Sequence, residues 1–60
     1  MELIEGLELY RRCLKHCDEV IAELYKSDLP KERKQALIDM ELDVRNMLQK
    51  RIEFIEELLR

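Results

Sequence analysis

The residues best suited to chemistry are two cysteines and a histidine within five positions of one another, Cys13, His16 and Cys17. Residues four apart on a helix lie one turn apart on the same face. Thiolates and imidazoles are the usual protein ligands of zinc, copper and other soft metals. A second copy of the chain would bring two more thiols, so four sulfur atoms could complete a tetrahedral site at a dimer axis.

The same three residues are also compatible with plain packing. Their spacing is neither the CxxC of a zinc knuckle nor the CxxCH of haem attachment. Free cysteine is among the most buried residue types. Catalysis by Cys17 would need a base and an orienting third group, and the chain has a single histidine. We therefore favour thiols that pack in a core, with no cofactor and no enzymatic activity, and keep metal binding as the alternative.

A second candidate site is a belt of positive charge that a hairpin would gather from both halves of the chain. Its members are Arg11, Arg12, Lys15, Arg45 and Lys50. Such a belt could bind the phosphate backbone of RNA or DNA. Acidic residues one turn before two of these arginines favour a solvated helix surface instead. Nucleic-acid binding is therefore the second functional hypothesis.

The composition is typical of long helices. Of the 60 residues, 42% are charged and 47% are apolar, and glycine and proline occur once each. The net charge of −3 does not draw the whole protein to nucleic acid or to an anionic membrane. No apolar run approaches the roughly 18 residues of a membrane span. No basic region opens the sequence, so we expect no signal peptide. We also expect a cytoplasmic location, in which the two thiols are free.

Apolar periodicity predicts two helices with one break between them. The first should run from about residue 2 to 26 and the second from about 31 to 59, with a turn at 27–30. Ser27 or Asp28 is expected to cap the second helix, and Pro30 to sit in its first turn. Because the connection is so short, the helices should be antiparallel neighbours. The predicted fold class is an all-α antiparallel two-helix hairpin.

An apolar seam with spacings of three and four residues follows each helix. The predicted seam comprises Leu3, Leu7, Tyr10, Leu14, Cys17, Ile21 and Leu24, then Leu37, Met40, Val44, Leu48, Ile52, Ile55 and Leu59. With its flanking residues the apolar face is wider than one partner helix can cover. The sequence therefore predicts that two identical hairpins pair into a four-helix bundle. Glu41 and Arg51 fall inside the apolar arc, where a charge can set register or partner choice.

The hairpin resembles the Rop family in length, in architecture and in the patch Glu8-Leu9-Tyr10-Arg11 followed by Cys13. The resemblance implies a homodimeric four-helix bundle that binds paired RNA loops. The residues themselves favour a small, self-associating interaction or regulatory module that acts by docking to itself and to another protein. Nucleic-acid binding through the basic belt ranks second, and metal binding by the thiols ranks third.

Overall fold

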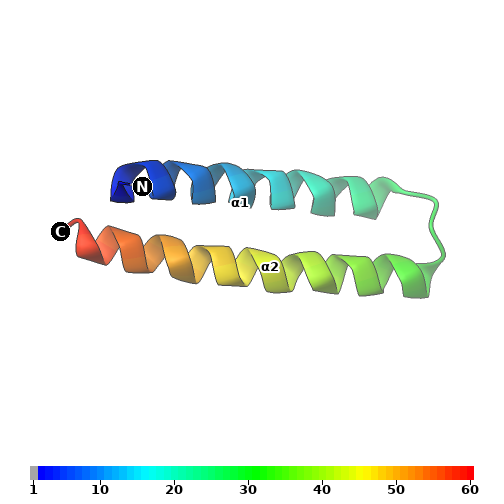
Figure 1. Cartoon of the computed structure of the whole chain (residues 1–60). Coiled ribbons are helices and arrows are strands. Elements are labelled where there is room, and N and C mark those ends of the chain that lie inside the picture. The colour runs from blue at the N-terminus through cyan, green and yellow to red at the C-terminus, as the bar shows by residue number, and fades with distance from the viewer. Residues whose placement is uncertain (1) are drawn as a thin grey trace.

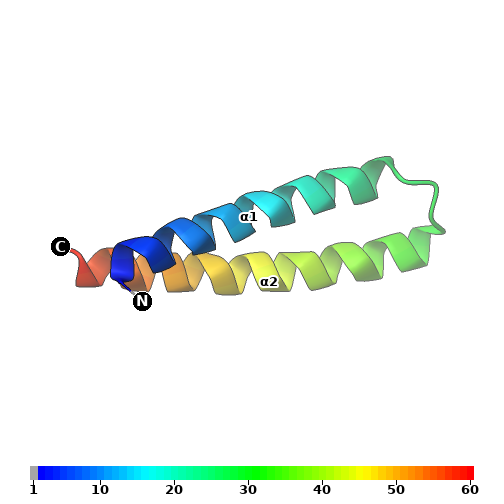
Figure 2. The ribbon, with the colours of Figure 1, turned by 45° about the horizontal axis from the view of Figure 1, so that its top comes forward.

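A computed structural model describes residues 2–60 of the chain as a pair of helices lying side by side. Helix α1 (Leu3–Lys26) and helix α2 (Lys31–Leu58) are joined by residues 27–30. Figures 1 and 2 show the helices running in opposite directions, with both chain ends at one end of the hairpin and the connection at the other. The hairpin measures 44 × 16 × 14 Å. The predicted all-α antiparallel hairpin is thereby confirmed.

The side chain of Ser27, in the connection between the helices, bonds to the end of α1 and does not cap α2. The Ser27 hydroxyl and the Ser27 N–H both donate to the Leu24 carbonyl, at 2.8 and 3.2 Å. Pro30 is the N-cap of α2, and no side chain caps that helix end. The Pro30 carbonyl accepts the first helical bond from the Lys34 N–H at 2.9 Å. The expected cap by Ser27 or Asp28 is therefore wrong, because Ser27 is committed to the preceding helix.

The core lies between the helices and is small. Its buried apolar residues are Leu7, Cys17, Ile38, Leu48, Ile52 and Ile55. Leu7, Ile52 and Ile55 pack together near the chain ends, with Tyr10 and Leu14 partly buried against them. Ile38, near the connection, is the most buried of all, with 1% of its surface exposed. Burial of these apolar side chains, together with the partly buried ones around them, stabilises the hairpin.

The face of α2 that meets α1 contains charged as well as apolar residues. In the first half of α2 this face carries Ile38, Glu41 and Arg45, and only Ile38 is fully buried. Met40 and Val44, which belong to the predicted seam, lie 64% and 41% exposed. The predicted seam of α2 therefore includes residues from two different faces of the helix. Sequence reasoning did not identify Ile38 as a core residue.

Ion pairs close one long edge of the hairpin. Arg11 Nη2 lies 2.9 Å from Glu56 Oε2, and Arg45 Nε lies 2.6 Å from Asp18 Oδ1. Residues seven apart on α1 and eleven apart on α2 return to the same side of each helix, so both pairs lie along the same edge. Their side chains are between 34% and 55% exposed. Each pair therefore contributes at most about 1 kcal/mol.

Candidate self-association surface

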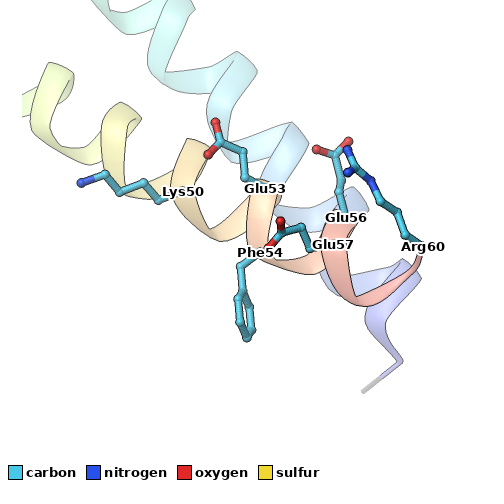
Figure 3. A pocket seen from close by; sticks show the side chains of 6 residues that line it. All are labelled: Lys50, Glu53, Phe54, Glu56, Glu57 and Arg60. Carbon is cyan, nitrogen blue, oxygen red and sulfur yellow. The ribbon is translucent and has the colours of Figure 1, made fainter.

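A stripe of mostly apolar side chains follows α2 on a side that does not face α1. Its members, spaced three and four residues apart, are Leu37, Met40, Val44, Met47, Arg51, Phe54 and Leu58. Met47 is 48% exposed, Phe54 62% and Leu58 54%. Figure 3 shows the Phe54 ring standing out from α2, apart from the other labelled side chains. Sequence reasoning did not single out Phe54, although its position seven residues after Met47 continues the same repeat.

Adjacent residues show how this stripe is turned relative to the core. Leu48 faces α1 and is 5% exposed, whereas Met47 is 48% exposed. One residue advances about 100° around an α-helix, so the stripe lies about a quarter turn from the core face. In a four-helix bundle each helix contacts two neighbours, one on each of two such faces. The second face of α2 is therefore placed where another helix would pack.

The stripe continues onto α1 across a shallow groove. The groove is lined by residues of both helices: Arg12, Cys13, His16 and Cys17 of α1, and Glu41, Val44 and Leu48 of α2. We call the stripe and the groove together the open face of the hairpin. The ion-paired edge lies on the other side, because Arg45 is turned about 100° away from its neighbour Val44. The hairpin thus has one edge closed by charges and one face that is apolar and uncovered.

The surface area of the hairpin is large for its mass. Its accessible surface is 5040 Å² for a chain of 7.3 kDa. A compact monomer of that mass would expose about 4,200 Å². The difference, roughly 800 Å², is close to the area that each partner buries in an interface of standard size. A second hairpin on the open face would cover about this much surface.

The two thiols of the groove have different environments. Cys13 is exposed and Cys17 is buried. Burial raises the pKa of the Cys17 thiol, and its hydrogen bond to the half-buried Glu41 carboxylate and the charge of that carboxylate raise the pKa further. Cys17 therefore stays protonated in the folded chain at neutral pH, as a small apolar side chain with one polar contact.

This arrangement predicts that the hairpin loses stability in alkali. The folded-state pKa of the Cys17 thiol lies above its ordinary value of 9.0. The contribution of the protonated thiol to the free energy of unfolding is therefore fully present below pH 9.0. It is lost as the pH rises further, because the unfolded chain releases the Cys17 proton first. Urea unfolding under reducing conditions, from neutral pH to above pH 9.0, should show this decline. The decline should be smaller in Glu41→Gln and still smaller in Cys17→Ser, and identical profiles in all three proteins would contradict the assignment.

The metal hypothesis finds no complete ligand set within one hairpin. Among residues 2–60, no group of three or more His, Cys, Asp or Glu side chains is arranged to hold a metal ion. Cys13 and His16 line the groove beside Cys17, so a thiol site would require ligands from a second chain. Metal binding stays a prediction that depends on self-association.

The residues of the basic belt lie on more than one face. Arg11 and Arg45 belong to the ion-paired edge, where carboxylates partly neutralise them. Lys50 lines a groove beside Met47 and Phe54, and five residues separate it from Arg45, which is about 140° around α2. Because its members are dispersed and partly paired, the belt is a weaker candidate than the open face. Nucleic-acid binding stays a prediction, which a steep loss of affinity with salt would support.

Glu41 and Arg51, the two charged residues predicted to set the register between helices or the choice of partner, lie apart from each other. Glu41 contacts Cys17, whereas the Arg51 guanidinium carbon lies 6.0 Å from the centre of the Tyr10 ring. Ten residues of helix separate them by about 15 Å. Neither belongs to an ion pair within the described part of the chain. Within residues 2–60, neither charge is therefore neutralised by an ion-pair partner.

No protein-family model matches the chain, and neither the curated proteins nor the solved structures show a significant match. Within residues 2–60, neither α1 nor α2 has a segment apolar enough for its length to cross a membrane. The features that bear on function are therefore the surfaces of the hairpin itself, and the open face gathers several exposed apolar side chains of α2.

Proposed function

We propose that the protein is a small, non-enzymatic interaction module that self-associates through its open face. Two hairpins form a four-helix bundle, and the bundle acts as a regulatory or scaffolding element by docking to another protein. The observation that carries this proposal is the exposed stripe on α2, which includes Met40, Val44, Met47 and Phe54. Spacings of three and four residues are typical of a seam between helices.

The size of the chain supports association. Domains of about 60 residues bury a small fraction of their surface and often gain stability from an oligomer. The 44 × 16 Å outline of the hairpin gives a face of about 700 Å², close to the roughly 800 Å² per partner of a standard interface. One hairpin can therefore supply a complete interface without any further segment.

The asymmetry of the hairpin supports a single association face. Ion pairs lie along one edge, and a partner seated there would have to desolvate Arg11, Asp18, Arg45 and Glu56. The open face carries Arg51 within its stripe and Arg12 and Glu41 along its groove, among exposed apolar side chains. Burial of those apolar side chains favours association there, and a single such face per chain favours a closed pair over an extended polymer.

Analytical ultracentrifugation tests the proposal directly. Over roughly a hundredfold range of protein concentration, the sedimenting mass should approach twice the 7.3 kDa of the chain. The midpoint of thermal unfolding should rise with concentration, because the dimer is the more stable species. A monomer with a concentration-independent midpoint would overturn the proposal. A cytoplasmic location stays a prediction of the sequence.

A further inference from the structure

We infer that the two hairpins pack with their α2 helices antiparallel, in the register that places Asp43 beside the partner's Lys50. This inference rests on the proposed self-association and adds to it the orientation and the register of the two copies. Three observations carry it: the position of Arg51 within the apolar stripe, the charges that flank the stripe, and the half-buried Glu41 beside Cys17.

Arg51 excludes a parallel pair of α2 helices. In a parallel, in-register pair, each seam residue faces its own copy, so the two Arg51 side chains would meet inside an apolar seam. Like charges at close range in a seam are strongly unfavourable unless a counter-charge is present. Flanking Asp43 and Lys50 would face Leu48 and Ile55 of the partner in that arrangement, so neither would gain an ion pair. An antiparallel pair separates the two arginines.

Two antiparallel α2 helices can pack stripe against stripe in two registers that bury most of the stripe residues. In the first, the two-fold axis passes between Arg45 and Asn46. Val44 then packs against the partner's Met47, Met40 against the partner's Arg51, and Leu37 against the partner's Phe54. In the second, the axis lies at Gln49, and Met47 packs against the partner's Arg51. Both registers use six seam residues per helix, so apolar contact does not distinguish them.

The charges on the flank of the stripe distinguish the registers. Residues that directly precede the first, third, fifth and seventh members of the stripe lie beside the seam and face their counterparts on an antiparallel partner. In the first register Asp43 lies beside the partner's Lys50, and symmetry gives this opposite-charge contact twice. In the second register Lys50 lies beside its own copy, and Asp43 lies beside the partner's Glu57. Both contacts of the second register are repulsive, so charge complementarity selects the first.

The position of Arg51 agrees with this selection. In the first register Arg51 lies at the level of the partner's Met40 and Glu41, and the two arginines are about 16 Å apart along the axis. Glu41 is half-buried, and within residues 2–60 it belongs to no ion pair. A guanidinium at that level would supply a counter-charge. In the second register the two arginines would be only about 6 Å apart along the axis.

A charge-swap experiment tests the register. Asp43→Lys and Lys50→Asp should each weaken dimerisation roughly tenfold at low salt, because each change converts two attractive contacts into two repulsive ones. The double variant Asp43→Lys/Lys50→Asp should restore the dissociation constant to within about threefold of the unaltered protein. The readout is the dissociation constant from sedimentation equilibrium.

Glu53→Lys is the matched control, since it makes the same change of charge as Asp43→Lys at a side chain that points away from Phe54 (Figure 3). It should leave the dissociation constant within about threefold of the unaltered protein. A double variant that is as weak as the product of its single variants would overturn the register while the dimer itself stood. A monomeric unaltered protein would overturn the proposed self-association, and the register with it.

Discussion

Met47→Asp should convert the dimer into monomers. The substitution puts a carboxylate into the centre of the open face of both copies, and an unpaired buried charge costs several kcal/mol. We expect the dissociation constant of the dimer to rise by more than about a thousandfold. Because Met47 is 48% exposed in the single hairpin, the change should not disturb packing between α1 and α2. Sedimentation equilibrium and the concentration dependence of thermal unfolding would measure the effect.

Leu42→Asp is the matched control for this substitution. Leu42 is 45% exposed and lies in the middle of the same helix, so the helix-forming cost of aspartate is alike at both positions. Its side chain is turned about 140° from Met47, away from the open face. Leu42→Asp should leave the dimer intact. Equal weakening by the two variants would indicate a general loss of helix stability and would remove the open face as the interface.

Ile38→Ala should have the largest effect of any single truncation on the stability of the hairpin. Ile38 is 1% exposed, and removing its side chain leaves a cavity between α1 and α2 next to the connection. Such truncations cost about 2–5 kcal/mol per chain, which is a large part of the stability of a domain this small. Urea unfolding followed by circular dichroism should show a midpoint far below that of the unaltered protein, or no cooperative transition.

Ile4→Ala is the control, because it removes the same atoms from a side chain that is 57% exposed. It should change the free energy of unfolding by less than about 1 kcal/mol. If Ile38→Ala were no more damaging than Ile4→Ala, the packing of the two helices near the connection would differ from that described above. Comparison at equal protein concentration removes any contribution from association.

The hairpin itself could be predicted from the sequence, and the physical reason is local. Long amphipathic stretches predict helices, and a four-residue break that contains the sole proline leaves room for little except a tight reversal. The cap of α2 could not be predicted in the same way. Ser27 can serve either neighbouring helix, and the choice depends on the path of the connection.

The face of α2 that meets α1 could not be predicted, since the helix carries two apolar stripes. In its first half the stripe toward α1 includes Glu41 and Arg45, so the hydrophobic pattern there is stronger on the open side. The predicted seam therefore followed the open face at Met40 and Val44 and the core face from Leu48 onward. Asp18 on α1 draws Arg45 to the edge, and this contact between helices leaves no trace in the pattern of α2.

The open face was predictable in outline and unpredictable in detail. The width of the apolar arc indicates that each helix has more to bury than its hairpin partner can cover. Which side of the hairpin stays open depends on how the two helices are rotated about their axes when they pack. Three-dimensional packing alone brings Arg11 and Glu56 together at one edge of the hairpin. It also places Cys13 and Val44 together on the uncovered side.

The position of the two chain ends gives the hairpin a further property. Both ends lie at the same end of the fold (Figure 1), and the axes of packed helices are about 8–10 Å apart. A surface loop of another protein could therefore be opened and joined to both ends without pulling its own anchor points apart. The hairpin is in this respect a cassette: it can be inserted into a host domain and project a 44 Å helical arm from its surface.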